Sequence, residues 1–129
     1  HILARKIECS EGYIVPAIDA RRDEIYFAMF QSTNCKIPEL KVKTDTMILS
    51  SDSFSNYYET STVNFVGDCN KKIMQYLNHE NIFFSDYILP SANEMGILSH
   101  SKYVKEQFVD VAEFQPKYLK EFGGKKINN

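Results

Sequence analysis

The sequence lacks tryptophan, holds only five glycines and four prolines, and has no marked excess of either charge. Its net charge of −2 leaves no basic field that would draw the chain to nucleic acid or to anionic lipid. The longest apolar runs, such as residues 82–84 and 88–89, are far too short to cross a bilayer. No basic and then apolar leader opens the chain, so nothing argues for secretion and we expect a cytoplasmic protein.

Cysteine is also scarce. Cys9, Cys35 and Cys69 are widely spaced, and no CxxC or CxxH pair occurs. The three histidines, at positions 1, 79 and 100, lie far from them in the sequence. This spacing supports no zinc site, and we expect reduced thiols.

What is present suits one compact domain of 129 residues, 43% of them hydrophobic. A chain of this length buries roughly two-thirds of its unfolded surface, which makes a core possible without metals or disulfides. The first residue is His1, and residues 2–7 read as the end of a helix that begins earlier, so we expect a piece of a longer protein. The polar, glycine-punctuated residues 123–129 are expected to be a flexible tail.

Two β-rich runs open the domain, at residues 13–18 and 25–30, and their nearly continuous apolar character predicts strands covered on both faces. The polar connection at residues 19–24 predicts an antiparallel hairpin. A third strand is expected within residues 36–43, where Pro38 is the feature against it.

Residues 44–61 are mostly polar, and Ser51-Asp52-Ser53 is expected to cap a short helix that carries Phe54, Tyr57 and Tyr58. Residues 63–66 predict a strand that stops at Gly67-Asp68. A helix is expected over residues 70–79, with one apolar face made of Ile73, Met74 and Leu77.

Short strands are expected at residues 82–84 and 87–89. Ser91-Ala92-Asn93-Glu94 then fits a capping box, which predicts a helix that runs to about residue 107. Its expected buried face is Met95, Leu98 and Val104, and Gly96 with His100 would let a neighbouring element approach closely.

The predicted order is three strands, a short helix, a strand, a helix, a strand and a helix. This order is typical of ribonuclease-H-like lobes, the repeating units of the actin, Hsp70 and sugar-kinase superfamily. We therefore predict an α/β fold: a mixed sheet with an antiparallel three-strand meander and flanking helices.

Two acids follow predicted strands, Asp19 after the first and Asp68 after the fourth. In ribonuclease-H-like nucleases, acids at these places help to hold Mg²⁺. Such sites need three or four carboxylates, and neither Asp52 nor Glu59 is well placed to complete one. The alternative makes Asp19 a turn residue that binds nearby backbone amides and Asp68 a helix cap. We expect no metal and no catalytic residues.

Arg21 and Arg22 stand side by side at the expected turn. Guanidinium groups bind carboxylates and phosphates bidentately, so this pair is a candidate contact for a partner. The alternative has both arginines solvated or paired with Asp23 and Glu24, which would contribute little. Because the sequence carries no phosphate-binding glycine loop and no GxSxG, we expect no cofactor and no ATP binding by this chain alone.

Three stretches resemble the TsaB family, also called YeaZ-type or glycoprotease-like. Residues 18–26 (IDARRDEIY) are similar to the family's hairpin, and residues 63–68 (VNFVGD) to its strand and following turn. Residues 110–122 (DVAEFQPKYLKEF) are similar to its closing signature, in the form associated with Bacteroidetes.

This resemblance implies the C-terminal lobe of a two-lobed protein, with residues 1–12 as the remnant of the inter-lobe segment and 13–122 as the lobe. It implies a non-catalytic subunit of the machinery that makes threonylcarbamoyladenosine in tRNA. The implied partners are a TsaD-like catalytic subunit and a TsaE-like ATPase, reached through the full-length protein, with tRNA contacted only indirectly.

The aromatic residues of the closing stretch are further candidates for contact. Tyr118 and Phe122, four residues apart, could fix this segment to the sheet or face another lobe. A lobe without its companion exposes apolar surface, so we also expect this chain to form a homodimer. The expected contributors are Ile2, Leu3 and Ile7 near the start and Phe114, Tyr118 and Phe122 near the end.

Overall fold

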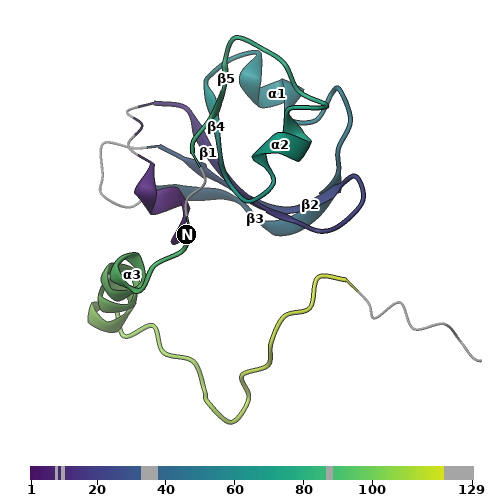
Figure 1. Ribbon diagram of the computed structural model, residues 1–129. Helices are drawn as coiled ribbons and strands as arrows, with labels where there is room; N and C mark the ends of the chain where they lie inside the picture. The colour runs from purple at the N-terminus through teal and green to yellow at the C-terminus, as the bar shows by residue number, and fades with distance from the viewer. Residues whose placement is uncertain (8, 10, 33–37, 87–88, 121–129) are drawn as a thin grey trace, which may run out of the picture.

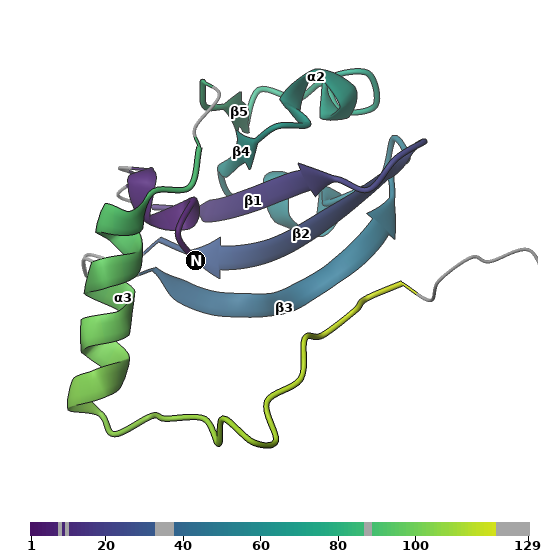
Figure 2. The same ribbon diagram turned by 60° about the horizontal axis from the view of Figure 1, so that its bottom comes forward.

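The computed structural model describes residues 1–7, 9, 11–32, 38–86 and 89–120. Its centre is a five-stranded mixed sheet with strand order β3-β2-β1-β4-β5. Strands β1, β2 and β3 form an antiparallel meander, and β4 and β5 run parallel to β1. Figures 1 and 2 show α1 and α2 over one face of the sheet, whereas α3 stands apart from it.

The first two strands confirm the predicted hairpin. β1 spans Tyr13–Asp19 and β2 spans Glu24–Gln31, and they pair from Tyr13 opposite Gln31 to Asp19 opposite Ile25. Both strands are largely buried because the sheet has packed side chains on both faces.

The third strand is longer than predicted. β3 spans Glu39–Ile48 and pairs with the whole of β2, so residues 44–48, expected to lie in a polar connection, belong to the sheet. Its polarity has a structural reason, since β3 is an edge strand and exposed charged side chains are ordinary there. Residues 36 and 37 of the predicted strand lie outside the described residues.

The short helix after β3 is confirmed as α1, Ser55–Tyr58, but the expected cap is wrong. Phe54 occupies the N-cap position with a left-handed backbone (φ 64°), and no side chain caps the helix. The Ser53 hydroxyl instead accepts a hydrogen bond from the Ser50 amide at 2.9 Å. The left-handed turn brings the Phe54 ring into the core, where it meets Phe27 edge-on at 5.2 Å.

Strand β4 spans Val63–Gly67, as predicted. The helix that follows is shorter than expected, because α2 covers only Asn70–Ile73 and then gives way to turns. Ile73 and Leu77 are buried as predicted, whereas Met74 is half exposed. Cys69 takes the N-cap position, so the prediction that Asp68 caps this helix is wrong.

Strand β5 spans Ile82–Phe84, also as predicted. Of the further strand expected at 87–89, residues 87 and 88 lie outside the described residues, and Leu89 is in no strand.

Helix α3 spans Ala92–Val104 and begins where the capping box predicted, but the box itself does not form. The Ser91 hydroxyl donates to the Glu94 carboxylate instead of accepting a bond from a helix amide. The expected buried face is also wrong: α3 buries no residue, and Met95 and Val104 are more than half exposed. No helix within the described ranges is long and apolar enough to cross a membrane.

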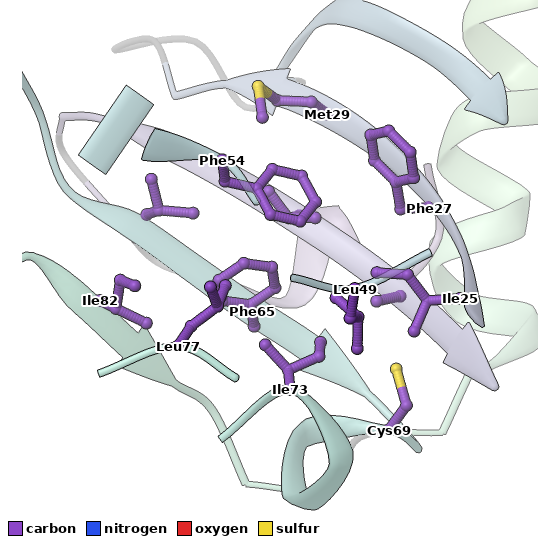
Figure 3. Close-up of a cluster of buried hydrophobic side chains, with 13 residues drawn as sticks. Ile25, Phe27, Met29, Leu49, Phe54, Phe65, Cys69, Ile73, Leu77 and Ile82 are labelled. Carbon is purple, nitrogen blue, oxygen red and sulfur yellow. The ribbon is translucent and has the colours of Figure 1, made fainter. Parts of the chain in front are cut away.

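The main core lies between the sheet and the short helices. Figure 3 shows Phe65 at its centre, with Ile73 and Leu77 approaching from the α2 side and Phe54 from α1. Phe65 contacts the Phe54 ring edge-on at 5.2 Å and stacks with Phe84 at 5.6 Å. These contacts join α1, β4 and β5 into one unit.

A smaller cluster covers part of the opposite face. The opening segment forms a 3-10 turn, η1, at Ala4–Lys6, and Leu3 and Ala4 are buried against Ile14, Phe30 and other residues of the sheet. Leu3, one of the residues expected to contribute to a homodimer, is therefore buried within its own chain. The division at residues 12 and 123 stays a prediction, and residues 123–129 lie outside the described residues.

Candidate functional site

The site lies where β1 and β4 end together. These parallel strands pair up to Ala17 opposite Gly67, and the acids that follow are therefore neighbours. The Asp19 amide donates to Asp68 Oδ1 at 2.9 Å. Gly67 permits this approach, because its backbone has φ 142° and lies so close to Ala17 that a side chain would collide with the Ala17 carbonyl.

The hairpin turn between β1 and β2 is closed by its own polar groups. Asp19 Oδ1 accepts a hydrogen bond from the Arg21 amide at 2.7 Å, as the turn interpretation of Asp19 predicted. The Ala20 amide donates to the Glu24 carbonyl at 3.1 Å, and the Glu24 amide donates to the Arg21 carbonyl at 3.2 Å. Arg21 and Arg22 both have left-handed backbones, with φ 70° and 49°.

Two contacts hold the far side of the turn, both at Asp23. The Leu49 amide, just after β3, donates to the Asp23 carbonyl at 2.7 Å. The Tyr76 hydroxyl, beyond α2, donates to Asp23 Oδ1 at 2.6 Å.

Two lysines hold the near side. Lys72 on α2 forms an ion pair with Asp19 and donates to the Glu24 carbonyl at 3.2 Å. Lys120, from the end of the described chain, pairs with the Glu24 carboxylate and donates to the Ala20 carbonyl at 3.1 Å. Its ammonium group also lies 5.7 Å from the centre of the Tyr26 ring, within range of a cation–π contact.

These neighbours perturb the ionisable groups. The hydrogen bond from Lys72 holds the pKa of Asp19 below its usual range, with a further contribution from the Arg21 amide. The Tyr76 hydroxyl donates to a carboxylate, which raises the pKa of that tyrosine. Burial, with the negative charge of Asp68 beside it, raises the pKa of the Cys69 thiol to about 12.

The side chains of Arg21 and Arg22 differ from those of the acids and lysines around the turn in their exposure and pairing. Both are exposed, and neither forms an ion pair within the described part of the chain. The two acids that could have formed ion pairs with these arginines bind other residues: Asp23 accepts a hydrogen bond from Tyr76, and Glu24 forms an ion pair with Lys120. The turn therefore presents two guanidinium groups to solvent from a backbone fixed by contacts with four other parts of the chain.

The metal hypothesis meets a specific obstacle. Asp19 and Asp68 do come together, as their places in the fold predicted, but Lys72 is bound to the Asp19 carboxylate. Among the described residues no three His, Cys, Asp or Glu side chains gather as metal ligands. The pair therefore acts in the structure as the joint between β1 and β4.

A hollow of about 470 Å³ adjoins the joint at the ends of β4 and β5. Asp68, Lys71 and Asp86 bring charges of both signs to it, and Met74 and Phe84 are its larger apolar residues. The mixed lining favours no single ligand class.

The remaining candidates belong to the closing stretch of the sequence. Tyr118 is 79% exposed, and Phe122 lies outside the described residues. Sequence reasoning missed Lys72, Tyr76 and Lys120. Only Lys120 had a signal, because it belongs to the closing stretch quoted above.

The antiparallel β1–β2–β3 meander with β4 and β5 parallel to β1 is a ribonuclease-H-like fold. No protein-family model matches the sequence, and no curated protein matches it either. Solved structures do match the fold. One is a Pseudomonas aeruginosa protein described as uncharacterized and similar to the peptidase YeaZ, with a TM-score of 0.73 and 19% identity over 92% of this chain and 55% of that one.

YeaZ from Pseudomonas aeruginosa matches with a TM-score of 0.64 and 19% identity, over 91% of this chain and 55% of that chain. At such identity the likeness shows the fold alone, and the fold is YeaZ-like. The chain spans about half the length of the structures it matches.

Proposed function

We propose that this chain is the C-terminal lobe of a TsaB-like protein and acts as a non-catalytic scaffold in the synthesis of threonylcarbamoyladenosine in tRNA. In this proposal the full-length protein supports a TsaD-like catalytic subunit and a TsaE-like ATPase in the cytoplasm, and tRNA is contacted only indirectly. The YeaZ-like fold supports it, together with the similarity of residues 18–26 to the hairpin of that family.

The observation that carries the scaffold role is the way the turn holds Arg21 and Arg22. Left-handed backbone costs a residue with a Cβ roughly 1–2 kcal/mol, so a turn that only had to reverse the chain would favour glycine or asparagine. Here two long cationic side chains occupy these positions, in a turn fixed by Asp19, Asp23 and Glu24. Such a pair suits the carboxylates of a protein partner, which guanidinium groups bind bidentately.

The test uses the full-length protein with Arg21→Ala and Arg22→Ala combined. The melting temperature should stay nearly unchanged, because these side chains have no described ion pair to lose. Capture of the TsaD-like subunit should weaken about tenfold, which is about 1.4 kcal/mol. The matched control removes two other exposed positive charges, at Lys102 and Lys105.

Equal capture by both double variants would contradict the role of the hairpin. The wider proposal needs a second measurement: loss of the gene should remove threonylcarbamoyladenosine from tRNA hydrolysates analysed by mass spectrometry. Unchanged levels would overturn it. The chain alone should capture the TsaD-like subunit poorly, because the resemblance to the TsaB family implies that most of the partner surface lies on the other lobe.

A rival from the enzyme class is a Mg²⁺-dependent nuclease or phosphotransferase lobe that uses Asp19 and Asp68. Their direct contact is the observation in its favour. Titration with Mg²⁺ or Mn²⁺ separates the two proposals: millimolar or tighter binding that is lost in Asp19→Asn would favour the rival, and no binding favours the scaffold.

A further inference from the structure

Lys120 joins the closing segment of the described chain, residues 105–120, to the hairpin. In Figure 2 this segment leaves α3 and runs back toward the end of the sheet where β1 and β2 meet. There the Lys120 ammonium group pairs with the Glu24 carboxylate and donates to the Ala20 carbonyl at 3.1 Å. The two side chains of the ion pair are only 36% and 24% exposed, so water and salt screen it in part. Glu24 is therefore neutralised by a cation from outside the hairpin.

The turn carries enough acid to neutralise its own arginines. Residues 19–24 hold three carboxylates and two guanidinium groups. Asp19 and Asp23 already accept hydrogen bonds from side chains of α2 and of the turns after it. Glu24 is the third acid, and among the described residues its carboxylate pairs with Lys120. The availability of the arginines therefore depends on what Glu24 binds.

Without Lys120, the Glu24 carboxylate would lie within reach of a guanidinium group. The Glu24 amide donates to the Arg21 carbonyl at 3.2 Å, which closes a four-residue turn whose end Cα atoms lie within about 7 Å of each other. A partly buried carboxylate that loses its cation is costly, so it would pair with the nearest positive group. Arg21 and Arg22 form no ion pair within the described ranges and are the nearest such groups along the chain.

We propose that Lys120 is a positioning residue of the hairpin: by pairing with Glu24, it keeps Arg21 and Arg22 free to bind the carboxylates of a partner. The partner contact itself belongs to the proposed function, on which this inference rests. Lys120 acts through Glu24 and needs no contact with the partner. The closing segment and the hairpin thus form one binding unit, although most of the sheet and α3 separate them in sequence.

The first test needs no partner. In NMR spectra of the chain, the Nε–Hε protons of Arg21 and Arg22 should exchange rapidly with water, because both groups are exposed. Lys120→Met should slow the exchange of at least one of them about threefold, since an exposed ion pair is only a few times more populated than its open form. Adding Glu24→Gln should restore rapid exchange, because the acceptor has lost its charge.

Lys117→Met is the matched control for this measurement. It removes the same charge from an exposed position three residues earlier, and Lys117 forms no ion pair within the described part of the chain. Unchanged exchange in Lys120→Met would overturn the proposal. Equal slowing in Lys117→Met would do the same.

The second test measures the dissociation constant of the full-length protein for the TsaD-like subunit. Lys120→Met should raise it about threefold, because an arginine that is paired part of the time lowers the apparent affinity by that fraction. In a Glu24→Gln background the same change at Lys120 should have almost no effect, and Lys120→Arg should keep the native affinity. An equal loss in both backgrounds would assign Lys120 to the partner contact or to the fold alone, and would overturn the proposal.

The two proposals fail separately. If Arg21→Ala with Arg22→Ala leaves capture unchanged, the partner contact is wrong even when the exchange rates show that Lys120 controls Glu24. If that double variant weakens capture and Lys120→Met does not, only the role of Lys120 is wrong. Should thermal unfolding show that Lys120→Met does not fold, Lys120→Gln replaces it in both tests, because glutamine removes the charge and keeps a hydrogen-bond donor.

Discussion

Replacement of Gly67 by alanine should be among the most damaging single changes in this lobe. Gly67 ends β4 with φ 142°, a conformation that residues with a Cβ rarely adopt. A Cβ at this position would lie 1.9 Å from the Ala17 carbonyl oxygen, about 1 Å closer than real Cβ atoms approach anything. The obstacle is backbone, so it cannot rotate away, and β1 and β4 must separate locally.

The cost follows from two terms. Backbone strain contributes roughly 1–3 kcal/mol, and the loss of a β1–β4 hydrogen bond contributes about another 1 kcal/mol. We therefore expect Gly67→Ala to lower the free energy of unfolding by roughly 3 kcal/mol, a large part of the roughly 5–15 kcal/mol of an ordinary domain. The contact of Asp68 with Asp19 would move with the strand end.

Urea unfolding followed by far-UV circular dichroism measures the loss as a lower midpoint at unchanged slope. Gly96→Ala is the matched control, because Gly96 lies within α3 with no atom within 4 Å of the added Cβ. It should leave the midpoint unchanged or raise it, since alanine favours helix over glycine by about 0.5–1 kcal/mol. A Gly67→Ala loss below about 1 kcal/mol, or an equal loss in Gly96→Ala, would refute this reasoning.

Three further outcomes follow from the site. Lys72→Met should raise the pKa of Asp19 toward its usual range, as measured by a carboxyl NMR titration. Because the pKa of Asp19 is depressed in the folded state, its carboxylate stabilises the fold at pH values above its unfolded pKa. This stabilisation is lost as the pH falls through the folded pKa. Cys69, with a pKa of about 12, should react with iodoacetamide at mildly alkaline pH far more slowly than an exposed thiol, and equal rates would contradict its burial. Calorimetry with ATP should show no binding to this chain alone, and micromolar affinity would overturn that prediction.

The strands could be predicted from the sequence because burial on two faces leaves a local signature. Runs such as residues 13–18 and 25–30 are apolar throughout, and the polar residues between them fix the hairpin. Only part of β3 could be predicted. Lys41, Lys43 and Asp45 alternate with less polar residues along this exposed edge strand, so its sequence resembles that of a loop.

The contacts of the site had no local signature. Lys72 and Lys120 meet the hairpin across 53 and 96 residues of sequence, and only the folded sheet brings them there. The same limit applies to α3: the capping pattern predicted where the helix begins, but periodicity cannot say whether a neighbour exists for Met95 or Val104 to pack against.

The hydrogen bonds and ion pairs of the acids at the hairpin bear on the two functions proposed for it. Asp68 accepts from the Asp19 amide, and Asp19 accepts from the Arg21 amide and binds Lys72. Asp23 and Glu24 are engaged in the same way, by Tyr76 and Lys120. A metal would have to displace these contacts and loosen the turn it binds to. Arg21 and Arg22 form no ion pair within the described residues, so the charged groups that remain for a ligand are cationic. This surface therefore suits an anionic partner better than a divalent ion.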